Sequence, residues 1–396
     1  MTNSNRRDFL KRSSVLAAGL CTALTDPSTV EAAADRPQNP DARFRYLGWQ
    51  LGLSYQASRP EGRRPEELRQ LLREMRDHGM NFISFMLVSY SFFDPEHDGF
   101  DWPVRREGLL SYRDERSLNA REETEFLGDV IQEAKEAGFH VQLMTNCGIW
   151  NPDRIIKGYP QTRPQVTWDD RRSGWVHCPD IPDGYRCVRD VILDALERYA
   201  RRGVASYAIE YPGYAGSGCF CEATRTAFAD ETGRELTPQW ARANRPEFDG
   251  WKQQHIGSIL KRLVDEVHAQ TPDVEIWLHT ACTASGGRGH APDPLRKAGI
   301  TATMPYLMHS PSPDFSRLSK NVDACYPLPA VAHVCVRAKP FKNYAIPPKN
   351  PALISKFFDA VEQTRMENLA GLVFFNETNV PPENRRAVYD GVKRFV

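Results

Sequence analysis

Two glutamates each follow a short apolar run of the kind that forms a buried strand. Glu210 follows residues 207–209, which read Tyr-Ala-Ile, and Glu377 follows residues 373–375, which read Val-Phe-Phe. Hydrolysis of a glycosidic bond needs one carboxyl group to protonate the leaving oxygen and another to attack the sugar or activate water. If both strands belong to one sheet, the two carboxylates can meet in one pocket, so we predict that they are the catalytic pair. Should one of them be structural, Asp94, Asp101 and Asp180 are the alternatives.

Aromatic, histidine and amide side chains gather near the same strand ends and in the loops beside them. Aromatic rings stack on the apolar faces of sugars, and imidazole and amide groups hydrogen-bond to sugar hydroxyls. The residues that we expect to bind substrate are Trp49, Tyr55, Tyr90, Asn146, Trp150, His177, Tyr211, Tyr214, His279, Tyr306, His309 and Asn376.

The same residue types leave two other interpretations open. Glu210, His279, His309 and Glu377 are of the types that hold a divalent metal in sugar isomerases and epimerases. A barrel that binds carbohydrate without catalysis is the other alternative. For the hydrolase, we expect neither a metal nor a cofactor.

Eight short runs rich in β-branched and aromatic residues alternate with helical patterns, which predicts a parallel sheet. Side chains at the C-terminal ends of the strands of a (β/α)8 TIM barrel converge on one pocket. No glycine-rich phosphate loop follows the first run, which favours this barrel over a dinucleotide-binding sheet. The expected strands are residues 46–55, 81–90, 140–150, 204–214, 273–281, 300–309, 330–337 and 371–380.

Glycines mark the ends of four predicted helices. Gly79, Gly138, Gly203 and Gly371 each stand between a helical pattern and a strand, where a left-handed residue is needed. The longest predicted loops follow strands two, three and four, so they should form the walls of one cleft. We therefore expect residues 35–396 to form a single TIM-barrel domain.

The amino-terminal residues predict export. Arg6 and Arg7 precede an apolar stretch at residues 15–24, and three alanines at 32–34 offer a cleavage site, so residues 1–34 resemble a twin-arginine signal peptide. The protein is then expected in the periplasm or outside the cell. Lys and Arg balance Asp and Glu at 51 each, which does not favour a nucleic-acid partner. No later run is long enough to insert into a membrane.

Residues 175–228 carry a family resemblance. Trp-Val-His-Cys-Pro at 175–179, a helix at 185–202, Gly-Cys-Phe-Cys at 218–221 and Phe228 resemble the barrel families called hypothetical glycosyl hydrolases. They are also similar to the cysteine-bearing loop of some bacterial β-galactosidases. The resemblance implies glycoside hydrolysis in which the carboxylate of strand four is either the nucleophile or the general acid/base.

The sequence departs from these relatives at two positions. Relatives end strand four with aspartate, where this chain has Glu210, and they complete a zinc cluster with a cysteine where this chain has Thr224. Two thiolates alone do not fill a tetrahedral zinc site, so a structural zinc is not expected. Cys178 and Cys187, which flank a turn before the third helix, are instead the expected disulfide pair.

Overall fold

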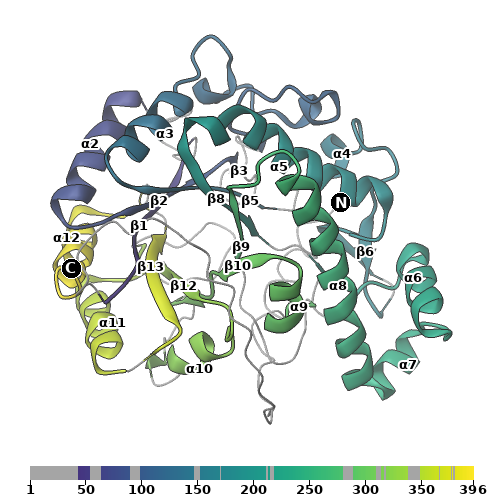
Figure 1. Cartoon of the computed structure of the whole chain (residues 1–396). Helices are drawn as coiled ribbons and strands as arrows, with labels where there is room; N and C mark the ends of the chain where they lie inside the picture. Colours follow the sequence, from purple (N-terminus) through teal and green to yellow (C-terminus); the bar gives the residue numbers. More distant parts are fainter. Residues whose placement is uncertain are drawn as a thin grey trace.

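Eight parallel strands close into a barrel, as the sequence predicts (Figure 1). The eighth strand pairs with the seventh strand and with the first strand, which closes the barrel. A short additional strand, β11 (Tyr306–Leu307), follows the sixth strand and pairs with the seventh, β12. The fold is therefore a (β/α)8 TIM barrel. Its strands, in spatial order, are β1 (Tyr46–Gly52), β2 (Phe82–Met86), β5 (His140–Asn146), β8 (Val204–Glu210), β9 (Glu275–His279), β10 (Ile300–Thr303), β12 (Ala330–Cys335) and β13 (Leu369–Phe375).

The structure is a computed structural model, in which part of the chain is described. Residues 172–176 are described by their backbone alone. The predicted signal peptide at residues 1–34 lies outside the described residues. The described ranges are 43–53, 64–89, 99–146, 152–169, 171–210, 213–214, 218–279, 289–308, 314–315, 318–337, 348–364, 366–375, 377 and 380–396.

Helices surround the barrel (Figure 1). The first shows why they form: Pro65 and two glutamates open it, and one face buries Leu68, Leu71, Leu72 and Met75 against the strands. None of the described helices combines the length and the apolar character needed to cross a bilayer. They are α2 (Pro65–Asp77), η1 (Glu107–Tyr112), η2 (Leu118–Ala120), α3 (Leu127–Glu136), α4 (Pro152–Ile155), α5 (Pro182–Gly203), α6 (Glu222–Thr232), α7 (Pro238–Ala243), α8 (Arg245–His268), α9 (Pro292–Lys297), α10 (Leu318–Asp323), α11 (Pro351–Gln363) and α12 (Pro382–Val392).

Three of the four glycines expected at helix ends have the left-handed conformation. Gly79, Gly138 and Gly203 have φ angles of 76°, 87° and 123°. The expectation for Gly371 is wrong, because α11 already ends at Gln363 and Gly371 lies within β13. A Cβ atom at that position would lie 2.3 Å from the carbonyl oxygen of Tyr46, so glycine is needed there for the close approach of β13 to β1.

Alternate side chains of the strands point into the barrel. Ser84 donates a hydrogen bond of 2.9 Å to Gln142, whose amide donates one of 3.2 Å to Ser206. Near the N-terminal ends of the strands, the rings of Tyr46 and Trp277 lie 4.9 and 5.3 Å from that of His140. Although part of the residue is exposed, burial of the imidazole among these rings lowers the pKa of His140 to about 3.

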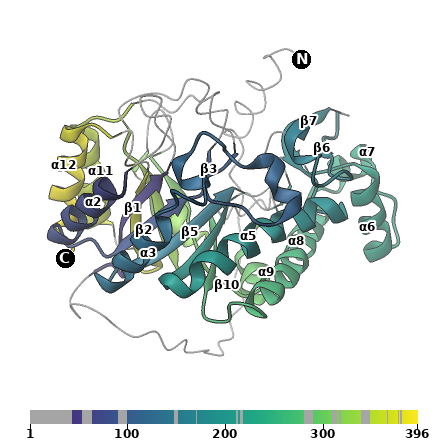
Figure 2. The ribbon, with the colours of Figure 1, turned by 90° about the horizontal axis from the view of Figure 1, so that it is seen from above.

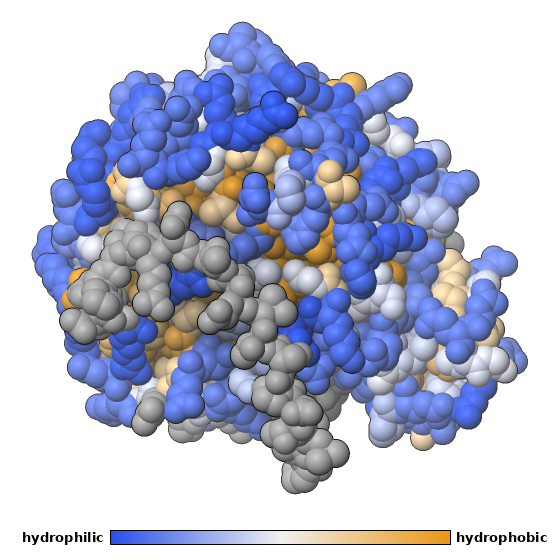
Figure 3. Space-filling model, viewed as in Figure 1, coloured by the Kyte–Doolittle hydropathy of each residue, from blue (hydrophilic) through white to orange (hydrophobic). Residues whose placement is uncertain are grey.

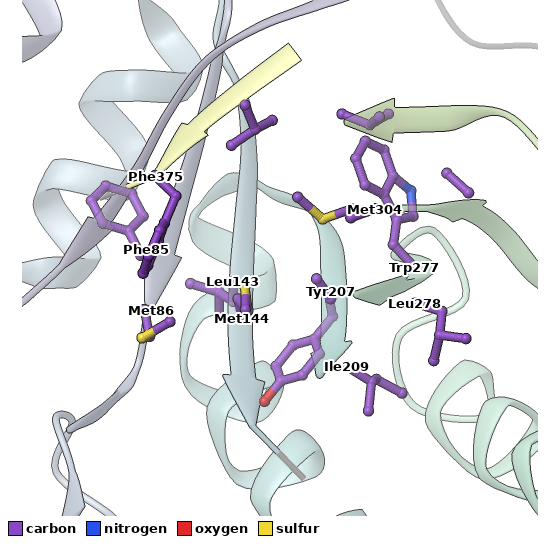
Figure 4. Close-up of a cluster of buried hydrophobic side chains, with 14 of the residues drawn as sticks. Phe85, Met86, Leu143, Met144, Tyr207, Ile209, Trp277, Leu278, Met304 and Phe375 are labelled. Carbon is purple, nitrogen blue, oxygen red and sulfur yellow. The ribbon is translucent and has the colours of Figure 1, made fainter. Parts of the chain in front are cut away.

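Apolar packing holds the barrel and its helices together. Buried hydrophobic side chains from neighbouring strands, including Phe85, Leu143, Tyr207 and Leu278, form a continuous cluster (Figure 4). At the surface, hydrophilic residues dominate the rim and hydrophobic ones lie toward the middle of the face viewed in Figure 3. The barrel is therefore a packed scaffold that holds the polar groups at its strand ends in place.

Insertions follow strands β2, β5 and β8, as expected. The first contains a short pair, β3 (Val88–Ser89) and β4 (Gly99–Phe100), the second a hairpin, β6 (Pro164–Val166) and β7 (Arg172–His177), and the third α6 and α7. Figure 2 shows β6, β7, α6 and α7 together at one end of the molecule, far from α11 and α12. The second and third insertions are thus neighbours in space.

Candidate active site

Glu210 is held by side chains from neighbouring strands at the C-terminal end of the barrel. It ends β8, is 7% exposed, and lies in register with Asn146 of β5 and His279 of β9. Tyr306 donates a 2.6 Å hydrogen bond to Oε1, and Asn146 donates one of 3.3 Å to Oε2. His279 Nδ1 lies 3.3 Å from Oε1. Polar groups from three strands thus surround one carboxylate, and two of them donate hydrogen bonds to it.

Two residues that the sequence analysis missed lie behind this arrangement. The ring of His333 in β12 stands nearly perpendicular to that of His279, with centroids 4.3 Å apart, and its Nε2 is hydrogen-bonded to Gln50 of β1. A polar residue inside an otherwise apolar strand was the available signal for both. We call Glu210, Asn146, His279, Tyr306, His333 and Gln50 the barrel-mouth cluster.

The cluster has the chemistry of a site in which a carboxylate accepts hydrogen bonds in a water-poor environment. Tyr306 also approaches His279 Nδ1, at 3.2 Å, so one hydroxyl links the carboxylate to the imidazole. Among the described residues, Nε2 of His279 is buried and has no hydrogen-bond partner. A buried polar atom without a partner is costly, and a bound hydroxyl group would satisfy it.

Glu377 has a different environment from Glu210. It lies two residues after the end of β13, is 2% exposed, and forms an ion pair with Arg385 of α12. Arg385 also forms an ion pair with Glu74 of α2, in which Nη1 lies 3.5 Å from Oε2. This series of charged side chains therefore extends into the layer of helices. Strands β8 and β13 lie on opposite sides of the barrel, so the two glutamates come from opposite strands. Their joint action in catalysis stays a prediction.

Trp49 lies away from the barrel-mouth cluster. Its ring packs between Phe374 of β13 and Tyr389 of α12, with centroids 5.5 and 6.2 Å away. This position contradicts the expectation that Trp49 lines the pocket. The next residue, Gln50, points into the barrel instead. Both faces of a barrel strand are buried, one by the interior and one by helices, so the hydrophobicity of β1 did not reveal which face was which.

The other predicted binding residues divide into three groups. Asn146, His279 and Tyr306 come together around Glu210. Tyr214 and His177 belong to the insertions, where Tyr214 donates a 2.8 Å hydrogen bond to Asp180 and His177 ends β7. The candidates that lie outside the described residues are Tyr55, Tyr90, Trp150, Tyr211, His309 and Asn376.

A second polar group lies between the insertions after β5 and β8. The thiols of Cys178 and Cys221 are 3.5 Å apart, and Cys219 lies beside them. Hydrogen bonding with Cys178 and Cys219 lowers the pKa of Cys221, whereas burial raises that of Cys178. We call Cys178, Cys219, Cys221 and Thr224 the cysteine cluster.

The predicted disulfide between Cys178 and Cys187 is wrong. Both cysteines are thiols, and they are not joined by a disulfide bond. Cys187 lies within α5 on its buried side, whereas Cys178 precedes that helix and its thiol turns toward α6. Among the alternatives for a second carboxylate, Asp94 lies outside the described residues, Asp101 is buried in the first insertion, and Asp180 lies beside the cysteine cluster.

Comparison with known proteins supports the fold. No protein-family model matches the sequence, and no curated protein sequence matches it. Among solved structures, α-L-fucosidase isoenzyme 2 from Paenibacillus thiaminolyticus is similar at 12% identity and a TM-score of 0.60, over 88% of this chain and 48% of that one. A β-galactosidase from Rahnella sp. R3 is similar at 14% identity and 0.61, over 90% and 56%. A β-N-acetylhexosaminidase from Bacteroides fragilis gives 8% and 0.55, over 89% and 66%.

These three neighbours are glycosidases by name. The chain spans about half the length of the first two. At such low identity the likeness shows the fold alone, so the chain has a glycosidase-like TIM barrel.

Proposed function

We propose that the protein is a glycoside hydrolase that acts on an oligosaccharide or polysaccharide. The observation that carries the proposal is the carboxylate of Glu210, which ends strand β8 and is oriented by Tyr306, His279 and Asn146. In barrels of this type the reacting groups lie at the C-terminal strand ends, where Glu210 stands. The glycosidase-like fold agrees with this chemistry.

In the proposed reaction, Glu210 either attacks the anomeric carbon or activates water, or it donates the proton to the leaving oxygen. Its partner is Glu377, from the opposite side of the barrel. Tyr306 and Asn146 each hold one carboxylate oxygen, so the group does not have to be ordered as the reaction begins. Buried Nε2 of His279 is the donor or acceptor that we expect to meet a sugar hydroxyl.

The proposal is tested by assaying the full chain on a panel of aryl glycosides and polysaccharides. Release of a reducing sugar that is lost in Glu210→Gln and retained in Glu275→Gln supports hydrolysis. Glu275 is a matched control because it lies on β9 at the opposite end of the barrel, where it hydrogen-bonds Trp277. Metal-dependent isomerisation of a free sugar, or binding without turnover, would instead select one of the two alternative functions.

The metal-dependent isomerase has less support among the described residues than the hydrolase has. The described His, Cys, Asp and Glu side chains form a metal-type grouping at the cysteine cluster, and Glu210 and His279 do not belong to it. We therefore keep the isomerase as an outcome of the assay.

We further propose that the protein is exported to the periplasm or beyond. The support is Arg6-Arg7, the apolar stretch and the alanines before Asp35. Changing Arg6 and Arg7 together to lysine should leave the precursor in the cytoplasm, which fractionation and immunoblotting would detect. Normal export of this double variant would contradict the proposal.

A further inference from the structure

The three thiols of the cysteine cluster have the spacing of ligands around one metal ion. The sulfur atoms of Cys178, Cys219 and Cys221 all lie within 4.8 Å of one another, and those of Cys178 and Cys221 are 3.5 Å apart. Zinc binds thiolates at about 2.3 Å with tetrahedral geometry, which separates the sulfurs by roughly 3.8 Å. Cys178 and Cys219 are fully buried, so the site is protected from water.

A threonine hydroxyl stands at the fourth corner of this arrangement. Thr224 Oγ1 lies 3.3 Å from the sulfur of Cys178 and 3.4 Å from that of Cys221. An oxygen ligand at about 2.0 Å from zinc would lie roughly 3.5 Å from each sulfur. The observed distances match this value, and Thr224 is completely buried.

Asp180 prepares the hydroxyl for this role. Thr224 donates its hydroxyl hydrogen to Asp180 Oδ2, which leaves the lone pairs of Oγ1 available on the side of the sulfurs. Asp180 is itself fixed, because Tyr214 donates a 2.8 Å hydrogen bond to Oδ2 and His255 Nε2 lies 2.7 Å from Oδ1. Groups that orient a ligand in this way usually strengthen metal binding.

We propose that Cys178, Cys219 and Cys221 bind one Zn²⁺ as thiolates, that Thr224 Oγ1 is the fourth ligand, and that Asp180 orients Thr224. This corrects the expectation from sequence, which considered the pair at 219 and 221 alone. Cys178 supplies the third thiolate, and a hydroxyl takes the place of the cysteine that relatives have at position 224. The proposal is independent of the hydrolase function.

The ion would join two insertions that the sequence separates. Cys178 follows the hairpin after β5, and Cys219 and Cys221 precede α6 in the insertion after β8. The backbone already links them, since Phe220 N donates to Val166 O at 2.7 Å and Val166 N donates to the sulfur of Cys219 at 3.3 Å. Zinc at this point would be a structural cross-link beside the mouth of the barrel.

Metal content and ligand type can be measured directly on the full chain. We expect about one zinc per chain by mass spectrometry after purification with zinc and exhaustive dialysis. Cobalt substitution should give thiolate-to-metal charge-transfer absorption. Cys178→Ser and Cys221→Ser should lose both signals, and Cys325→Ser, which removes a buried thiol elsewhere, should keep them. Wild-type protein without zinc, or with a Cys178–Cys221 disulfide, would overturn the proposal.

The fourth ligand is tested by three further variants in competition with a chelator of known affinity. Thr224→Val should weaken zinc binding by about tenfold or more, and Asp180→Asn should weaken it by about tenfold. Thr224→Cys should bind zinc more tightly than wild type and increase the cobalt charge-transfer intensity by about one third. Unchanged affinity in Thr224→Val would show that the threonine oxygen is not a ligand, which overturns the assignment of the fourth site.

Discussion

The barrel-mouth cluster and the cysteine cluster are assembled in different ways. Glu210, Asn146 and His279 are neighbours because their strands are in register, so the sheet alone brings them together. The members of the cysteine cluster come from two insertions, and they meet because these insertions pack against each other. The first cluster therefore belongs to the scaffold, whereas the second organises segments added to it. We expect changes in the first to alter turnover, and changes in the second to alter stability.

The largest effect should come from the two glutamates. Glu210→Gln and Glu377→Gln keep the shape of the side chain but remove the carboxylate, so each should lower kcat by about 10²–10⁴-fold. The Tm of Glu210→Gln should change little if the cluster serves chemistry. Steady-state kinetics and thermal unfolding check both statements. If Glu377→Gln keeps full activity, its ion pair with Arg385 is structural and the second carboxylate is Asp94 or Asp101.

Tyr306→Phe should lower kcat by roughly 10–100-fold with little change in KM. The change removes a hydrogen bond to a carboxylate, which contributes about 1.5–3 kcal/mol. Tyr207→Phe is the matched control, because this hydroxyl makes a 2.6 Å hydrogen bond to Thr145. Equal losses of kcat in the two variants would mean that Tyr306 stabilises the fold and does not orient Glu210.

Removal of zinc should lower the Tm and leave kcat almost unchanged, which is the opposite of the effect expected for the glutamate variants. An ion present at a hundredfold excess over its Kd stabilises the folded state by about 2.7 kcal/mol. Because one kcal/mol corresponds to about 1–1.5 °C in a domain of this length, chelation should lower the Tm by roughly 3–4 °C. At 25 °C, kcat should stay within about twofold of its original value. Loss of kcat without a shift in Tm would reverse the roles that we assign to the two clusters.

The smallest effect concerns His140, which lies at the end of the barrel away from both clusters. Burial holds its folded-state pKa at about 3, so the unfolded chain binds a proton below pH 6.5 that the folded chain does not. Stability should therefore fall as the pH decreases below 6.5, by at most about 1.4 kcal/mol between pH 6.5 and 5.5. Urea unfolding at the two pH values measures this change in the free energy of unfolding. The variant His140→Phe should have a weaker dependence of the free energy of unfolding on pH. The same dependence on pH in that variant would contradict the assignment of the effect to His140.

The sequence predicted the framework closely for a physical reason. β-Branched runs between helix-ending glycines mark strands well, and the strands beginning at Tyr46, His140 and Val204 start where they were expected. The residues of the barrel-mouth cluster at strand ends could also be anticipated. Gln50 and His333 were missed because an apolar strand with two buried faces hides its inward side. Trp49 was misplaced for the same reason.

The cysteine cluster was beyond the reach of local patterns. Cys178 and Cys187 are close in sequence, which suggested a pair, but Cys187 lies on the buried side of α5, whereas Cys178 precedes that helix. The partners of Cys178 are Cys221 and Thr224, and this neighbourhood depends on how two long insertions fold against each other. Spacing along the chain carries little information about such a contact.

The closure of the barrel by β13 has a consequence for how the protein folds. Tyr46 of β1 pairs with Gly371 of β13, so nearly the whole chain lies between these partners. Contacts between residues so distant in sequence form slowly, since a long loop must close first. Until β13 arrives, β1 and β12 present open edges to which other chains can pair. A chain truncated before Leu369 should therefore aggregate rather than form a smaller barrel.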